Sequence, residues 1–89
     1  MCRSIKPLFN FAPPATDEDI RAAALQFVRK IAGTRKPSQR NTDAFDVAVE
    51  EIFQSTQRML EGLVATTPPK DRALFEQTKR ARFKKAERR

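Results

Sequence analysis

The chain has 89 residues, of which 39% are hydrophobic and 33% charged, and its formal net charge is +7 at pH 7. This length suits one domain with a small core. It contains no His and a single Cys, which excludes imidazole catalysis, an ordinary zinc site and an internal disulfide. We expect no metal and no cofactor, and a binding protein is favoured over an enzyme. No apolar run is long enough for a transmembrane helix, and nothing requires an oxidising compartment, so a cytoplasmic location is expected.

Residues 1–16, MCRSIKPLFNFAPPAT, form the least helical part of the chain. Pro7 and the pair Pro13–Pro14 favour extended or turn backbone. We interpret this segment as an ordered arm across the helices, with Leu8, Phe9 and Phe11 filling a core that two helices cannot close. In the alternative, Phe9 and Phe11 stay exposed and stack on bases.

Cys2 is the weak candidate for a catalytic residue. If Met1 is removed, its thiol lies beside the α-amino group, and Arg3 would lower the thiol pKa. The alternative is a small buried hydrophobic residue.

The first helix is predicted over residues 17–32. Thr16 is a good N-cap, Asp17, Glu18 and Asp19 suit the first turn, and Gly33 suits the position after the helix. The apolar stripe consists of Ile20, Ala24, Phe27 and Ile31, with Ala23 and Val28 on its shoulders.

A basic loop follows, GTRKPSQR, in which Pro37 interrupts helical structure. Cations and a hydroxyl group at helix ends can hold phosphate groups. The alternative is a solvated connection. The candidate phosphate-binding residues here are Arg29, Lys30, Arg35, Lys36, Ser38 and Arg40.

The second helix is predicted to start near Asn41, or at Ser38, and to pack antiparallel to the first. Gly62 and the run Thr66-Thr67-Pro68-Pro69 are expected to end it. Its stripe at helical spacing is Phe45, Ala48, Val49, Ile52, Thr56, Met59, Leu60 and Leu63, widened by Phe53 and Val64. Acidic residues dominate this stretch, so an acidic middle separates two basic regions.

A third, basic helix is predicted over residues 70–89, starting at Asp71 or at the entry through Thr67 and two prolines. Leu74, Thr78 and Ala81 form its narrow apolar stripe. From residue 79 the cations surround the helix axis, which predicts a solvated tail that is disordered without an anionic partner. The alternative is a basic arm that binds nucleic acid, a membrane surface or an acidic protein. The second set of candidate phosphate-binding residues is Lys79, Arg80, Arg82, Lys84 and Lys85.

Four pieces of the chain, MCRSI, LFNFAPPATDEDIRAAALQFVRKIAG, RKPS and FDVAVEEI, resemble a family of small bacterial proteins catalogued only as a domain of unknown function. The resemblance covers roughly residues 1–65 and the following Pro-Pro, and little of the tail after Asp71. It implies a compact, mostly helical protein and no activity or site that could be transferred.

The sequence thus predicts an all-α fold, in which an antiparallel helix hairpin carries an ordered N-terminal arm and a third, basic helix. Residues 1–78 should form one domain, and 79–89 a basic tail. The leading hypothesis is a small non-enzymatic protein that binds nucleic acid through phosphate contacts. The alternatives are a homo-oligomer or module that binds an acidic protein, and a redox, metal or catalytic site centred on Cys2.

Overall fold

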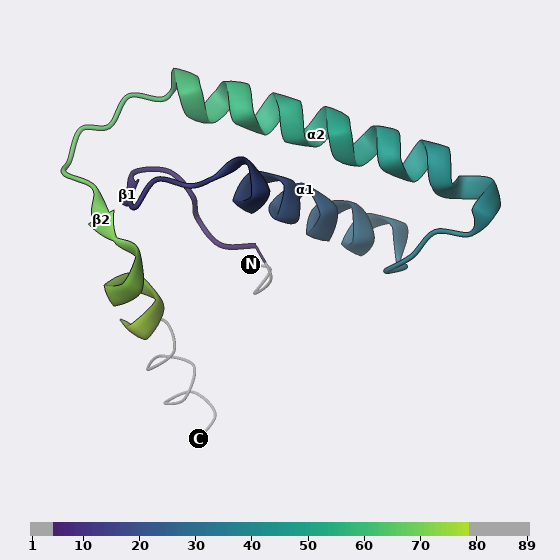
Figure 1. The fold of residues 1–89 in the computed structure, drawn as a ribbon, viewed down its shortest axis with the longest axis horizontal. Coiled ribbons are helices and arrows are strands. Elements are labelled where there is room, and N and C mark those ends of the chain that lie inside the picture. Colours follow the sequence, from purple (N-terminus) through teal and green to yellow (C-terminus); the bar gives the residue numbers. More distant parts are fainter. Residues whose placement is uncertain (1–4, 79–89) are drawn as a thin grey trace.

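The computed structural model describes residues 5–78. In chain order the elements are the short strand β1 (Phe11–Ala12), helix α1 (Asp17–Ala32), the 3-10 turn η1 (Gln39–Asn41), helix α2 (Thr42–Gly62) and the short strand β2 (Lys70–Asp71) (Figure 1). Residues 72–78 are helical. The predominance of helix confirms the predicted all-α class, and the two-stranded sheet is a small addition that the sequence did not predict.

The ends of α1 follow the predicted signals. The Asp19 N–H donates to Thr16 Oγ1 over 3.2 Å, and the Thr16 N–H donates to Asp19 Oδ2 over 2.9 Å. This reciprocal capping box satisfies two backbone donors that the helix leaves free. At the other end Gly33 adopts φ +74°, and its N–H donates to the carbonyl of Arg29. Both predicted boundaries of the first helix are therefore confirmed.

Helix α2 ends at Gly62, the first of the predicted end signals, and it begins differently from the expectation. Asn41 occupies the N-cap position without a capping hydrogen bond from its side chain. The chain instead enters the helix through η1, and the Thr42 hydroxyl donates to the carbonyl of Ser38 over 3.1 Å. Tight 3-10 turns of this kind are common at helix ends.

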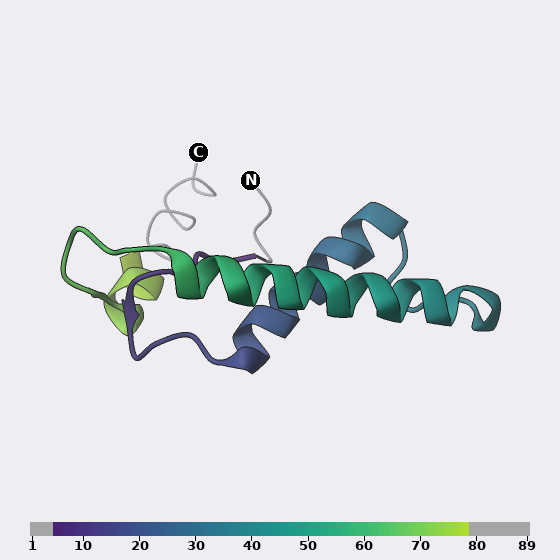
Figure 2. The same ribbon diagram turned by 90° about the horizontal axis from the view of Figure 1, so that it is seen from above.

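The core lies between α1 and α2, which run in opposite directions and cross one another (Figures 1 and 2). Each helix contributes three buried residues spaced four apart along the chain, which lie on one face of a helix. These residues are Ile20, Ala24 and Val28 from α1 and Phe45, Val49 and Phe53 from α2.

The predicted apolar stripes were wrong in part, because α1 turns Val28 and not Phe27 toward α2, and because the contact between the helices is shorter than the stripes. Phe27 is 46% exposed and Ile31 is 74% exposed, while Val28 takes the buried place. On α2, Phe53 is central to the core, whereas Met59, Leu63 and Val64 are exposed. Crossed helices bury only the residues near their crossing, so an apolar stripe longer than the contact leaves its ends in solvent.

The described part of the N-terminal arm, which starts at residue 5, meets two partners. Leu8 packs against the hairpin core, as predicted. Phe11 instead lies in a separate contact: β1 pairs in parallel with β2, with Phe11 opposite Lys70. The Phe11 ring is only 4% exposed and packs edge-on against Phe75, with ring centroids 5.1 Å apart. The alternative in which Phe11 is exposed for base stacking was therefore wrong.

The third helix also differs from its prediction. Its first residues form β2, and the helix starts at residue 72. Asp71 does supply the predicted start signal, since its Oδ1 accepts the N–H of Leu74 over 2.9 Å. However, Leu74 is exposed, and the arm contacts Arg72 and Phe75 instead. Ala81 and the predicted tail 79–89 lie outside the described residues.

Candidate functional site

The predicted phosphate-binding residues around the first loop lie in the last turn of α1, which contains Arg29 and Lys30, and in the turn that joins α1 to α2. The turn is tied down by its own hydrogen bonds: the N–H groups of Gly33 and Thr34 both donate to the carbonyl of Arg29, over 3.0 and 3.2 Å. The Thr34 hydroxyl donates to the carbonyl of Lys36 over 2.9 Å. The cations are therefore displayed from a backbone with defined geometry.

Three of the predicted cations come together on this turn. Arg29, Lys30 and Arg35 line one open hollow of about 480 Å³ with Gln26, Gly33 and Thr34. Arg29 uses Nε to donate to the carbonyl of Arg35 over 3.0 Å, which fixes the plane of its guanidinium group. Its terminal nitrogens then remain the natural donors for an oxyanion. We call Arg29, Lys30 and Arg35 the basic triad.

The other candidates of the first loop do not line this hollow. Ser38 instead lines an apolar groove between the helices. Lys36 and Arg40 are exposed residues of the turn. The predicted set of six is therefore divided by the structure, and a single compact site would use the basic triad.

The electrostatics of the turn favour an extended anion over one small ion. Within residues 5–78, neither salt bridge involves a cation of the turn. The triad nevertheless lies at the C-terminal end of α1, where the helix dipole is negative and opposes an anion. Side-chain cations must outweigh that dipole, which is easier when several phosphates are contacted together.

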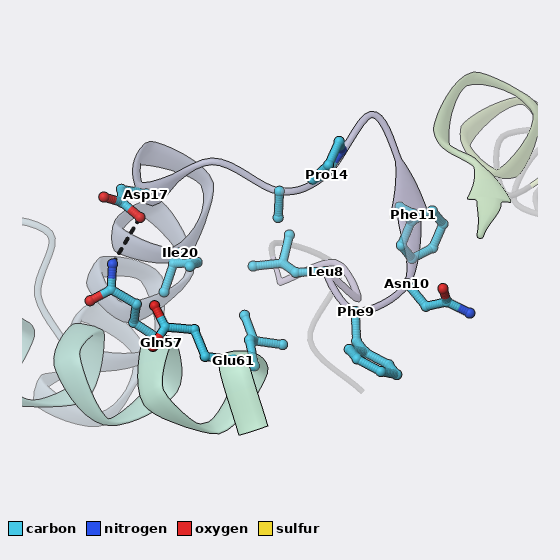
Figure 3. A pocket seen from close by; sticks show the side chains of 11 residues that line it. Leu8, Phe9, Asn10, Phe11, Pro14, Asp17, Ile20, Gln57 and Glu61 are labelled. Atoms are coloured by element: carbon cyan, nitrogen blue, oxygen red, sulfur yellow. Dashed lines mark hydrogen bonds between the residues drawn. The ribbon is translucent and has the colours of Figure 1, made fainter. Parts of the chain in front are cut away.

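A second hollow, of about 320 Å³, lies between the arm and the hairpin (Figure 3). Leu8, Phe9 and Ile20 form part of its apolar wall. Its polar residues include Asp17 and Gln57, whose Oδ1 and Nε2 atoms are joined by a hydrogen bond of 2.9 Å, together with Asn10 and Glu61 (Figure 3). The Asp17 carboxylate accepts this hydrogen bond at the protein surface, so the hollow offers polar groups beside an apolar wall.

The titratable groups with shifted pKa values serve structure. A hydrogen bond from the Thr16 backbone lowers the pKa of Asp19, and a hydrogen bond from Arg21 lowers the pKa of Glu50. Arg21 also lies over the Phe53 ring, 4.1 Å from its centroid. No polar or charged residue among those described is buried. Because their pKa values are lowered, the Asp19 and Glu50 carboxylates stay ionised at neutral pH and are not poised for proton transfer.

Several predicted residues have no described position. Cys2 lies outside residues 5–78, as do Lys79, Arg80, Arg82, Lys84 and Lys85. Among the residues described, no group of three or more acidic or thiol side chains is arranged to hold a metal ion. Likewise, no helix in residues 5–78 combines the length and apolar character of a membrane span.

The fold defines a small helical-hairpin protein with a basic turn between its two helices. The chain matches, over residues 1–79, the model of a family described as an uncharacterized conserved protein (DUF2277), and it belongs to this family. The match extends the expected resemblance through β2 and the helical residues 72–78. No curated protein and no solved structure matches the chain.

Sequence reasoning missed two features of the surface. One is the apolar groove beside the turn, and the other is the packing of Arg72 on Phe11. Both depend on contacts between distant segments, and the local spacing of apolar residues carries no signal for either. The net charge, by contrast, was visible in the composition, and the basic loop was visible in the sequence.

Proposed function

We propose that the protein binds nucleic acid through its phosphate backbone, with the basic triad as the contact on the hairpin turn. The observation that supports this proposal is the gathering of Arg29, Lys30 and Arg35 around one open hollow in a chain of net charge +7. Arg and Lys side chains displayed together supply the sequence-independent part of nucleic-acid binding.

The same contacts predict binding with little sequence preference. The Phe11 ring is buried against Phe75 and so cannot stack on a base. The hollow itself is lined by cations, an amide and small residues, with no aromatic side chain. Phosphate contacts without base contacts give affinity that tolerates changes of sequence. The hypotheses for Lys36, Ser38 and Arg40, and for the cations of residues 79–89, stay predictions.

The proposal is tested with a double variant, Arg29→Gln with Arg35→Gln, and a matched control, Lys6→Gln with Arg58→Gln. Each removes two positive charges, and the control residues are exposed and lie away from the hollow. Binding to mixed-sequence DNA and RNA is followed by fluorescence anisotropy between about 50 and 200 mM salt. We expect the triad variant to lower the magnitude of the salt slope by about 2 on duplex DNA, and the control by much less.

Circular dichroism of both variants establishes that they are folded. The proposal is wrong if the wild-type protein does not bind at the lowest salt concentration, or if its affinity does not change with salt. Equal losses of affinity in the two double variants would also contradict the proposal, because binding would then depend on net charge alone and not on the basic triad.

A further inference from the structure

An apolar groove of about 400 Å³ lies between the helices next to the turn, and neither the proposed function nor the family description accounts for it. It opens where the end of α1 diverges from α2 (Figure 2). Val28 and Phe45 of the buried core are part of its lining, and it shares only Thr34 with the hollow of the basic triad. The groove is therefore a separate cavity, and its volume falls within the roughly 300–1,000 Å³ of ordinary ligand pockets.

The lining of the groove has two chemically distinct parts. Every lining residue that α1 or α2 contributes is apolar. The polar lining residues are Thr34, Ser38 and Asn41, and all three belong to the segment that joins the helices. Among the described residues that line the groove, none is charged. The groove thus combines a long apolar part with an uncharged polar end at the turn.

The polar end offers hydrogen-bonding groups to a ligand. Asn41 stands at the N-cap of α2 and Ser38 stands before η1, and neither side chain makes a capping hydrogen bond. The Thr34 hydroxyl donates to the carbonyl of Lys36, and its oxygen can still accept. An amide and a hydroxyl group each have both donor and acceptor capacity, so they can pair with a hydroxyl, carbonyl or amide group of a small molecule.

The absence of charge from the described lining indicates which ligands suit the groove. An ionic group placed at this end would lose water and gain no counter-ion, which is costly. A purely apolar molecule would remove water from Asn41 and Ser38 without replacing its hydrogen bonds. We propose that the groove binds an uncharged amphiphile, a small molecule with an apolar body along the two helices and one neutral hydrogen-bonding group at the turn.

Two other occupants fit this lining less well. A second copy would bring together two chains of charge +7, each with a basic turn beside its groove. The chain's own residues 79–89 are rich in Lys and Arg, and these side chains would find no counter-ion in the described lining.

The test uses the full chain and N-phenylnaphthylamine, an uncharged probe whose fluorescence rises in apolar surroundings. Decanol, decanoate and decyltrimethylammonium, which share one alkyl length, then compete for the site below their micelle-forming concentrations. We expect decanol to displace the probe, and each ion to require at least about tenfold higher concentration, because the lining supplies no counter-ion.

A filling variant tests whether the groove is the site. Ala44 lines the groove from an exposed position of α2, so Ala44→Trp places a ring inside it. The matched control Val47→Trp adds the same ring at a residue of α2 that is 55% exposed and does not line the groove. We expect Ala44→Trp to weaken binding of decanol at least about tenfold, and Val47→Trp to change it less than about twofold. Circular dichroism checks folding, and Ala44→Leu serves if Ala44→Trp does not fold.

A second pair of variants tests the polar end. Asn41→Ala removes an amide that makes no capping hydrogen bond, and Gln39→Ala removes an amide from a neighbour that does not line the groove. The loss of one hydrogen bond should weaken binding of decanol about threefold or more in Asn41→Ala. Binding by Gln39→Ala should match wild type.

Several results would overturn the inference. Decanol could fail to displace the probe, or either ion could displace it as well as decanol does. Equal binding by Ala44→Trp and Val47→Trp, or by Asn41→Ala and Gln39→Ala, would place the ligand elsewhere. A dimer in sedimentation equilibrium that is lost in Ala44→Trp and kept in Val47→Trp would assign the groove to a second copy. All four variants retain the basic triad, so the salt dependence of nucleic-acid binding is measured separately.

Discussion

At the scale of single residues, Arg72 has a role that its charge did not suggest. Its guanidinium carbon lies 3.6 Å from the centroid of the Phe11 ring, and one terminal nitrogen donates to the carbonyl of Pro7 over 2.6 Å. The other terminal nitrogen donates to Glu76 over 3.4 Å. Within the basic region that starts at residue 70, Arg72 is therefore a packing residue that joins the arm to the third helix.

We expect Arg72→Ala to destabilise the protein by about 1–3 kcal/mol, because it removes a stacked cation and a charged hydrogen bond to backbone. Arg72→Lys should recover part of the loss, since an ammonium group lacks the planar fork. Urea unfolding followed by circular dichroism measures both. The control Arg58→Ala changes an exposed residue and should cost no more than about 0.5 kcal/mol, and an equal cost for both positions would contradict the assigned role.

Asp19 makes stability depend on acidic pH. Its pKa is lowered below the ordinary value of 3.8, first by the hydrogen bond from the Thr16 backbone, so the folded state holds the proton less tightly than the unfolded state. The resulting stabilisation is complete above the unfolded pKa and is lost as pH falls through the folded pKa. Asp19→Asn should therefore flatten the loss of stability below about pH 4.

Thermal unfolding between pH 7 and pH 2 measures this effect of Asp19. Glu18→Gln is the control, because Glu18 lies in the same first turn without taking part in the capping box. If both variants follow the same pH profile, the capping box is not the source of the acid sensitivity.

At the scale of elements, the end of α1 depends on a glycine and the end of α2 does not. Gly33 adopts φ +74°, where an added Cβ is strained although nothing lies within 4 Å of it. Gly62 is also free of neighbours within 4 Å, but its φ lies outside that left-handed range. Substitutions at these two glycines therefore differ in backbone strain while neither is crowded.

We expect Gly33→Ala to cost about 1 kcal/mol and Gly62→Ala to be neutral or to stabilise by up to about 1 kcal/mol. The midpoint of urea unfolding for each variant measures the difference. Gly33→Asn should cost less than Gly33→Ala, because Asn tolerates the left-handed conformation. Two alanine variants with the same stability would show that the end of α1 adjusts freely.

The elements also show how far the sequence could predict this fold. Thr16, Gly33, Gly62 and Asp71 carry local signals, and each marks a helix boundary in the structure. The buried faces were harder to predict, because helical spacing allowed both Phe27 and Val28, and only the crossing of α1 and α2 decides between them. Pairing of β1 with β2 was beyond local reasoning, since two-residue strands leave no periodic pattern.

At the scale of the whole molecule, the chain is a thin, open structure. Its extents are 43 × 39 × 16 Å, so in its shortest direction it is scarcely thicker than one helix with its side chains. A structure this thin has few fully enclosed positions, and the described core contains no side chain less than 2% exposed. The candidate site was predicted only in part. The cations of the turn were visible in the sequence, whereas the groove arises from the crossing of the helices.

The contact between β1 and β2 has a consequence for synthesis of the chain. Asn10 donates from its side chain to the carbonyl of Thr67, which is 57 positions later. At a translation rate of about 5–20 residues per second, the arm waits for several seconds before its partner exists. During that interval Phe11 has no ring to pack against and β1 has an unpaired edge. The hairpin can therefore form first, and a ribosome-bound chain exposes an apolar arm that the released protein keeps covered.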